Sequence, residues 1–111
     1  MFFQTVNMIQ FLKNIFGGGP KVNMQELIAR GAIIVDVRTY REYQSGHLKN
    51  SANIPLDELS GNIAKLDKSK PVITCCSTGM RSRSAKNILK SNGFSEVYNG
   101  GAWTSLRKFE N

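Results

Sequence analysis

Cysteine and histidine are scarce in this sequence, and it has no long apolar run. Only two cysteines occur among 111 residues, the neighbours Cys75 and Cys76. Adjacent cysteines cannot join distant parts of a chain, so a disulfide framework is excluded. His47 is the single histidine, so a zinc site would lack its usual nitrogen and sulfur ligands, and we expect no metal. Two free thiols favour a reducing compartment, and we expect the cytoplasm.

Acidic residues are also few. The chain has 8 Asp and Glu against 15 Lys and Arg, a formal net charge of +7, which favours anionic partners. The basic residues are scattered in ones and twos and no nucleic-acid-binding signature occurs, so we expect a small anion and no nucleic acid. A chain of 111 residues with 41% hydrophobic residues is typical of one soluble domain, and we expect a monomer.

The first segment of the chain differs from the rest. Apolar residues recur at positions 2, 6, 9, 12 and 16, which predicts an amphipathic helix over residues 1–16. Polar residues interrupt this pattern, so neither a signal peptide nor a membrane-spanning helix is expected. We favour a helix packed on the domain, and an anchor that contacts a membrane surface or binds a partner is the alternative. Residues 17–20 are a Gly/Pro linker, and residues 21–111 are the predicted domain.

Short apolar runs alternate with helical patterns after the linker. The β-branched run at 33–37 and the run at 71–75 predict strands buried on both faces, and shorter strands are expected at 51–54 and 96–98. Helices are expected over residues 24–29, 39–44, from 55 or 56 to 64, and 81–91. This alternation predicts an α/β fold, with a central, mostly parallel sheet flanked by helices.

One loop combines a thiol with an anion-binding backbone. It contains Cys76, Ser77, Thr78, Gly79, Met80, Arg81 and Ser82, between a predicted strand and a predicted helix. A helix amino terminus offers unpaired N–H groups and a positive dipole end, which favour a thiolate, so Cys76 should be reactive. Gly79 permits a turn whose amides point inward, and Arg81 adds a charge suited to a tetrahedral anion.

Two registers of this loop compete. Five residues separate Cys75 from Arg81, which is the spacing of cysteine phosphatases, whereas counting from Cys76 gives a shorter loop. The shorter loop makes a tighter ring that suits a sulfur atom better than a phosphate. We favour Cys76 and interpret Cys75 as a small core residue, and a phosphatase that uses Cys75 is the less favoured alternative.

The same residues resemble a known family. The pattern Cys76-x-x-Gly79-x-Arg81-Ser82 resembles the active-site loop of rhodanese-like domains. Four further segments agree with that family, in order and spacing: 36–38 (Asp-Val-Arg), 42–48, 52–55, and Gly100-Gly101 with Trp103, which resembles a closing turn. The resemblance covers residues 21 to about 108 and leaves out the segment before Gly17.

The resemblance implies a rhodanese-like fold and a sulfurtransferase activity. Cys76 would attack the outer sulfur of an anionic donor such as thiosulfate, hold that sulfur as a persulfide, and pass it to a thiophilic acceptor such as cyanide or a thiol. The N–H groups of residues 77–82 would stabilise the negative charge, and Arg81 would help to hold the donor. No metal or organic cofactor is implied. The alternative is a module that delivers sulfur to a partner protein, or binds an anion for it, without turnover of its own.

Charged residues outside the loop have simpler interpretations. Asp36 and Arg38 lie at the end of a buried strand, where such groups tie neighbouring loops together, so we expect both to be structural support. For His47 we expect a structural hydrogen bond and no catalytic role.

Overall fold

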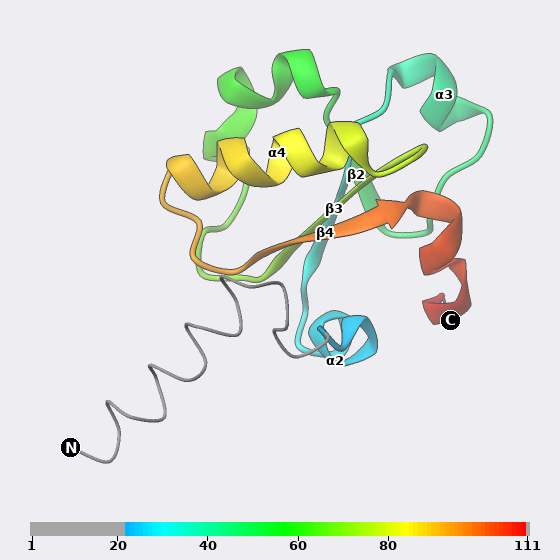
Figure 1. The fold of residues 1–111 in the computed structure, drawn as a ribbon, viewed down its shortest axis with the longest axis horizontal. Helices are drawn as coiled ribbons and strands as arrows, with labels where there is room; N and C mark the ends of the chain where they lie inside the picture. The colour runs from blue at the N-terminus through cyan, green and yellow to red at the C-terminus, as the bar shows by residue number, and fades with distance from the viewer. Residues whose placement is uncertain (1–21, 111) are drawn as a thin grey trace.

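The chain folds into a four-stranded parallel sheet with helices on both faces (Figure 1). This computed structural model describes residues 22–110, so the predicted helix 1–16 and linker 17–20 lie outside the described residues. The sheet has the order β2-β1-β3-β4, formed by β2 (Ser51–Asn53), β1 (Ile33–Asp36), β3 (Val72–Cys76) and β4 (Val97–Ala102). The predicted α/β fold with a parallel central sheet is confirmed.

The helices form two layers around this sheet. One face is covered by α4 (Met80–Ser91) and the 3₁₀ helix η1 (Leu56–Lys65), and the other by α2 (Met24–Ala29) and the 3₁₀ helix η2 (Trp103–Phe109) (Figure 1). The short helix α3 (Tyr40–Gln44) lies beyond the carboxyl ends of the strands. No helix within residues 22–110 has the length and hydropathy needed to cross a membrane.

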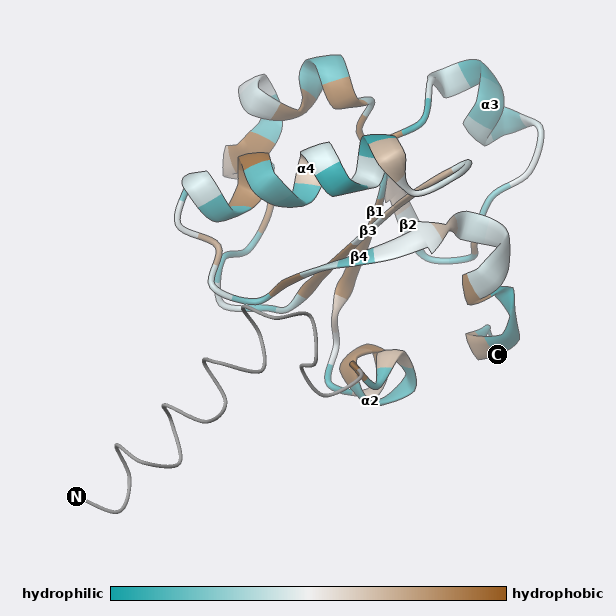
Figure 2. Cartoon of the chain, viewed as in Figure 1, coloured by the Kyte–Doolittle hydropathy of each residue, from teal (hydrophilic) through white to brown (hydrophobic). Residues whose placement is uncertain are grey.

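The apolar core is split by the sheet into two clusters. Side chains alternate between the faces of a strand, so Val72 and Cys76 pack with Leu89 of α4, whereas Ile73 and Cys75 pack on the opposite face. Strand β3 is buried along its whole length, and Figure 2 shows β1 and β3 mostly in apolar colours, with α3 hydrophilic. The two adjacent cysteines therefore belong to different layers of the molecule.

Side-chain caps fix the starts of the two short helices. The Asn23 side chain accepts a hydrogen bond from the Glu26 N–H at 3.0 Å at the start of α2. At α3, Thr39 and Glu42 form a reciprocal capping box. Both helices occur within a residue of the predicted bounds, because Asn and Thr are typical N-cap residues and can be recognised in the sequence.

The end of the sheet differs from the prediction. Strand β4 continues to Ala102, beyond the predicted 96–98, so Gly100 and Gly101 are part of a strand and Trp103 begins η2. A Cβ on Gly100 would lie 2.8 Å from Ile73 Cγ2 and 3.0 Å from the Thr74 carbonyl oxygen. The two strands approach too closely for a side chain there, and a run of Asn and Gly carries no strand signal. The helix expected up to residue 64 is present as the 3₁₀ helix η1.

The carboxyl ends of all four strands meet at one edge of the sheet. Strand β1 is flanked by β2 and β3, so the chain leaves β1 and β3 in opposite directions and opens a crevice between them. Such a point is the usual ligand site of an open parallel sheet. Cys76 ends β3 at this crevice, beside the end of β1.

Candidate active site

The Cys76 sulfur lies inside a ring of hydrogen-bond donors. It accepts hydrogen bonds from the backbone N–H groups of Gly79 at 3.0 Å and Ser82 at 3.4 Å. The Ser82 hydroxyl oxygen is also 3.4 Å from the sulfur. Strand β3 ends at this cysteine and α4 begins four residues later, so the loop turns its amides back onto the sulfur. The predicted loop therefore forms a cradle for a sulfur anion.

These contacts determine the ionisation of the thiol. Burial raises the pKa of Cys76, but hydrogen bonds from the Ser82 hydroxyl and from the N–H groups of Ser82, Gly79 and Thr78 together bring the pKa below its ordinary value. The residue is 0% exposed, so the stabilising dipoles are protein groups rather than water. Cys76 is a buried thiol whose ionised form is favoured by its surroundings.

Asn99 holds the cradle together and was not singled out from the sequence. Its side-chain oxygen accepts hydrogen bonds from the Ser82 hydroxyl at 2.6 Å and from the Gly101 N–H at 2.9 Å. Its side-chain nitrogen donates to the carbonyl oxygen of Gly79 at 3.1 Å. Gly79 has a φ of +99°, a left-handed conformation that favours glycine. Asn99 lies just beyond the predicted end of this strand and gave no signal, because its role depends on the pairing of β3 with β4.

Arg81 is already paired with a carboxylate. Its two terminal nitrogens donate to the two carboxylate oxygens of Glu42, at 2.7 and 2.9 Å. The Ser77 hydroxyl joins this group, 3.1 Å from Glu42 and 3.2 Å from Arg81. These hydrogen bonds hold the pKa of Glu42 well below its usual range and raise the pKa of Arg81. Among the described residues, Arg81 donates to Glu42 and Ser77 and makes no hydrogen bond to Cys76.

Glu42 is therefore a second residue of the site that residue-by-residue reasoning missed. It lies in the segment 42–48 that resembles the family, but the resemblance alone predicts no contact between Glu42 and the loop. The carboxylate also accepts the Thr39 N–H at 3.0 Å, which fixes it at the first turn of α3. The sequence separation of 39 residues between Glu42 and Arg81 concealed the pair.

Asp36 and Arg38 form a buried ion pair behind the site. Arg38 Nη2 and Asp36 Oδ2 are 2.7 Å apart, and both residues are almost fully buried. The same guanidinium donates to the carbonyl oxygens of Glu42 at 3.2 Å and Gly46 at 2.7 Å, and it stacks over Trp103. The pair ties β1 to the middle of α3 and to the turn that follows it, and so positions Glu42.

Cys75 and His47 have structural surroundings rather than those of a reactive group. Burial raises the pKa of the Cys75 thiol to about 12, and its side chain is packed with Ile73 and Leu106 on the other face of the sheet. His47 Nδ1 lies 2.7 Å from the carbonyl oxygen of Tyr43, so this nitrogen carries the proton, and its ring stacks on the Tyr43 ring at 3.8 Å. Cys75 is a core residue, and His47 makes the structural hydrogen bond expected of it.

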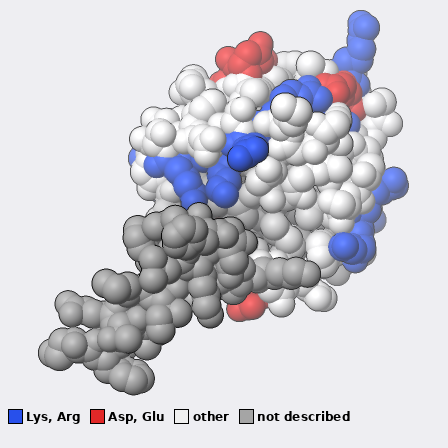
Figure 3. Space-filling view, in the orientation of Figure 1, with Lys and Arg blue, Asp and Glu red and all other residues white. Residues whose placement is uncertain are grey.

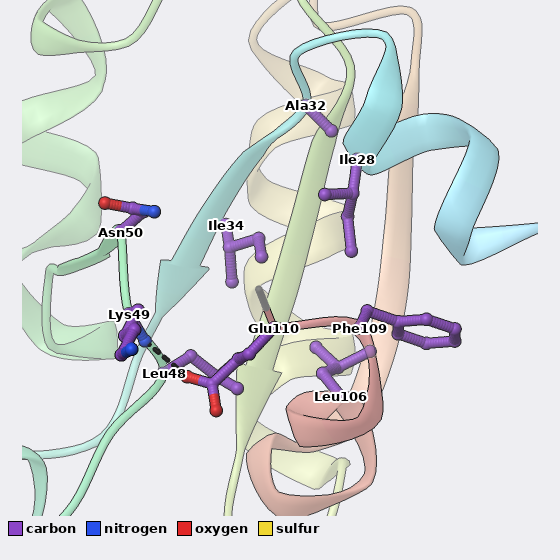
Figure 4. A pocket seen from close by; sticks show the side chains of 9 residues that line it. All are labelled: Ile28, Ala32, Ile34, Leu48, Lys49, Asn50, Leu106, Phe109 and Glu110. Atoms are coloured by element: carbon purple, nitrogen blue, oxygen red, sulfur yellow. Dashed lines mark hydrogen bonds between the residues drawn. The ribbon is translucent and has the colours of Figure 1, made fainter.

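Two cavities differ in their relation to this loop. One, of about 360 Å³, is lined by Val37, Thr39, Pro55, Leu56, Asp57 and Arg81, so it adjoins the loop. Another, of about 300 Å³, lies on the opposite face of the sheet between α2, β1 and η2, where the Lys49 N–H donates to the Glu110 carboxylate at 2.6 Å (Figure 4). The first of these cavities contains Arg81 of the loop, whereas the second contains no residue of the loop.

The sequence and the fold both have known relatives. Residues 21–103 match the family model of the rhodanese-like domain. The thiosulfate sulfurtransferase GlpE of Pseudomonas savastanoi pv. phaseolicola is 38% identical over 79 residues, which cover 71% of this chain and 74% of that protein. A second GlpE, from Coxiella burnetii, is 36% identical over 62% of this chain and 64% of its own length.

Solved structures agree with this assignment. A rhodanese from E. coli, solved with anions, superposes with a TM-score of 0.63 at 36% identity, covering 67% of this chain and 89% of its own. A rhodanese-related protein from Thermoplasma volcanium gives a TM-score of 0.65 at 31% identity, over 75% of this chain and 82% of its own. With a parallel sheet, a cysteine at the end of its third strand and a ring of amides around that sulfur, the chain belongs to the rhodanese-like domain family.

Proposed function

We propose that this chain is an enzyme that carries sulfur as a persulfide on Cys76, taking it from thiosulfate and passing it to cyanide or a thiol. The class of the enzyme, a rhodanese-type sulfurtransferase, follows from its family and from several relatives named thiosulfate sulfurtransferase. The observation that supports the proposed nucleophile is the pair of N–H groups, from Gly79 and Ser82, that point at the Cys76 sulfur.

The first step loads the cysteine. The Cys76 thiolate attacks the outer sulfur of thiosulfate, a new S–S bond forms, and the original S–S bond breaks as sulfite leaves with the bonding electron pair. The negative charge of the resulting persulfide falls on the added sulfur atom. Loop amides that face this region stabilise that charge in place of water. The lowered pKa of Cys76 supplies the thiolate without a general base, consistent with a His47 that is engaged with Tyr43.

The second step returns the free thiolate. Cyanide, or the thiolate of an acceptor, attacks the outer sulfur of the persulfide and the Cys76 sulfur leaves with the electron pair. Thiocyanate or an acceptor persulfide is the product. Because the same amides stabilise the leaving thiolate, one cradle serves both half-reactions.

Glu42 competes with the anionic donor for the Arg81 guanidinium. Its terminal nitrogens bind Glu42, so an incoming dianion must share or displace this carboxylate before Arg81 can hold it. The cavity of about 360 Å³ that Arg81 lines is the space in which this exchange would occur. We assign Arg81 the binding of the anionic donor, through rearrangement of this pair.

Mass spectrometry after exposure to thiosulfate tests the proposal. We expect one sulfur atom to be added at Cys76, cyanide to remove it as thiocyanate, and Cys76→Ser to abolish both. Cys75→Ser is the matched control, and it should load as the parent does. Absence of any loading with thiosulfate, or loading that depends on Cys75, would contradict the proposal.

Two alternatives have different signatures. A sulfur-delivery module would transfer sulfur from Cys76 to a protein thiol much faster than to cyanide. A phosphatase would hydrolyse an aryl phosphate in a manner that depends on Cys75, whose buried thiol lies on the face of the sheet away from the loop. This placement gives the phosphatase alternative no support.

The setting of the enzyme is also part of the proposal. We expect a monomer that binds a small anionic donor and no nucleic acid. Because both cysteines are free, we expect the enzyme in a reducing compartment such as the cytoplasm. The position of the persulfide needs neither a metal nor an organic cofactor.

A further inference from the structure

Helix α4, which begins at the catalytic loop, carries basic side chains and no acidic one. Its residues Met80–Ser91 include Arg81, Arg83, Lys86 and Lys90. Arg81 is paired with Glu42, whereas no ion pair or hydrogen bond within residues 22–110 joins an acidic side chain to the other three. We refer to Arg83, Lys86 and Lys90 as the basic stripe.

The rest of the chain does not neutralise the basic stripe. Residues 1–21 and 111 contain no Asp or Glu, so all eight acidic residues of the protein are among those described. Six of them bond to other partners: Asp36 to Arg38, Glu42 to Arg81, Glu58 to Tyr40, Asp67 to Ser69, Glu96 to Arg30 and Glu110 to the Lys49 N–H. The other two, Glu26 and Asp57, are in the first turns of α2 and η1. Arg83 and Lys90 are exposed and Lys86 is half-buried, and no acidic side chain among the described residues is bonded to the stripe.

This arrangement is unfavourable for the isolated protein. Burial and the nearby charges of Lys90 and Arg83 lower the pKa of Lys86, so the three groups repel one another. Arg83 and Arg81 also lie near the positive end of the helix dipole, where cations are disfavoured. An anionic surface placed against the stripe would remove both penalties.

The stripe runs along the same face of α4 as an exposed apolar residue of the loop. Met80 is 77% exposed, and Arg83, Lys86 and Lys90 follow it at the spacings of three, three and four residues that place side chains on one helix face. In the space-filling view, basic side chains lie across the middle of the visible face and acidic ones only toward its margins (Figure 3). Exposed methionine is common in protein-binding surfaces.

We propose that Met80 and the basic stripe form the docking surface for an acidic protein whose reactive cysteine accepts the Cys76 sulfur as a thiol or donates it as a persulfide. This inference rests on the proposed function. A protein fits better than a nucleic acid, because Met80 offers an apolar contact at the loop and a protein can present a cysteine that exchanges sulfur with Cys76 at that end of the helix. The basic stripe would orient the partner so that its thiol reaches the Cys76 loop.

Two synthetic peptides, each with one cysteine, test the surface. The cysteine is flanked by four Glu in one peptide and by four Lys in the other, and transfer of sulfur from persulfide-loaded protein to each thiol is timed. The variant Arg83→Gln/Lys86→Gln/Lys90→Gln removes the stripe, and Lys49→Gln/Lys70→Gln/Lys108→Gln removes the same charge from exposed lysines elsewhere. Comparing proteins with the same peptide cancels the difference in peptide thiol pKa.

For the acidic peptide, we expect the stripe variant to be about tenfold slower than the parent at low salt, with the difference lost in ~0.5 M salt because charges at a surface are screened. The Lys49/Lys70/Lys108 variant should stay within about twofold of the parent, because close charges dominate. Equal slowing in both variants, or no slowing in either, would overturn the docking surface.

Two further measurements separate this idea from others. Discharge of the same persulfide by cyanide, a small monoanion, should slow far less in the stripe variant than transfer to the acidic peptide does, which would show that its chemistry is intact. If no persulfide forms, the proposed function fails, and fluorescence anisotropy of the labelled acidic peptide with the unloaded protein still tests the surface. A short RNA that competes at lower concentration than the acidic peptide would assign the stripe to nucleic acid and contradict the proposal.

Discussion

Ser82 affects the reactivity of Cys76 through both its backbone and its side chain. Its N–H donates to the sulfur, and its hydroxyl lies between the sulfur and Asn99. When the thiol is protonated it donates to the Ser82 oxygen, and the Ser82 proton goes to Asn99; when the thiol ionises, the Ser82 proton turns from Asn99 to the sulfur. One serine can thus serve both ionisation states.

Replacing this hydroxyl should change a pH profile. In Ser82→Ala the pKa of Cys76 should rise, because a hydrogen bond that lowers it is lost. Less thiolate is then present at a given pH, so the inflection in the rate of alkylation by iodoacetamide moves to higher pH. The measurement uses a Cys75→Ser background, with Ser84→Ala on the exposed side of α4 as the control. An unchanged inflection would show that the backbone N–H groups alone set the pKa.

Glu42 should control access of dianions to Arg81. Glutamine at position 42 keeps the capping box of α3 but removes the charge that holds Arg81, so Glu42→Gln should lower the KM for thiosulfate by about threefold to tenfold with little change in kcat, as expected for about 1 kcal/mol of released pairing. Steady-state kinetics measure this effect. Glu96→Gln, which breaks the pair with Arg30, is the control. A higher KM in Glu42→Gln would mean that Glu42 holds Arg81 in its binding position.

At the scale of the elements, the close contact of β3 and β4 supports the cradle. Asn99 and Gly100 lie on β4, and the absence of a side chain at Gly100 lets the strand approach Ile73 and the Thr74 carbonyl. This approach brings the Asn99 side chain to Ser82 and Gly79. The packing of a strand thus sets the shape of a loop in another part of the chain.

Adding a methyl group at Gly100 should therefore destabilise the fold. Gly100→Ala would place a Cβ 2.8 Å from Ile73 Cγ2, and overpacking of this kind costs about 1–3 kcal/mol. Gly61→Ala, where a Cβ meets nothing within 4 Å, should change stability by no more than about 0.5 kcal/mol. Urea unfolding of both variants measures the difference. Equal stability of the two variants would show that β4 can move away from β3.

The predictability of the fold also varies by element. Strands β1 and β3 and the capped helices α2 and α3 were predicted because their signals are local: β-branched runs for the strands, and Asn23 and Thr39 for the helices. Strand β4 was predicted only in part, since Asn99, Gly100 and Gly101 have no strand preference of their own and are extended because β4 pairs with β3. In the site, the spacing of Cys76, Gly79 and Arg81 predicted the loop. Glu42 and Asn99 could not be predicted, because only the fold brings them into contact with it.

At the scale of the whole molecule, the dominant property is its positive charge. A net charge of +7 attracts small anions from any direction, and the only carboxylate bound to the loop, Glu42, is itself neutralised by Arg81 within the described residues. The field of the protein should then speed the arrival of thiosulfate.

Salt should affect the two half-reactions differently. The value of kcat/KM for loading by thiosulfate should fall several-fold between about 20 and 200 mM sodium chloride, because the Debye length shortens. Discharge to a small thiol without other charges, at fixed pH, should fall less over the same range, because its attacking thiolate carries one negative charge and thiosulfate carries two. Stopped-flow or quenched mass measurements of each half-reaction give both values. An equal fall in both would indicate an effect of salt on the fold rather than on the approach of the donor.

The opposite orientation of the two thiols also determines how the protein would respond to peroxide. Cys76 would be oxidised to a sulfenic acid, and the usual protection is a second thiol that traps it as a disulfide. Cys75, the sole other cysteine, faces the other layer, with the sheet between the two sulfurs. Rescue must then come from an external reductant, and without one the oxidation of Cys76 proceeds to the sulfinic acid and becomes irreversible.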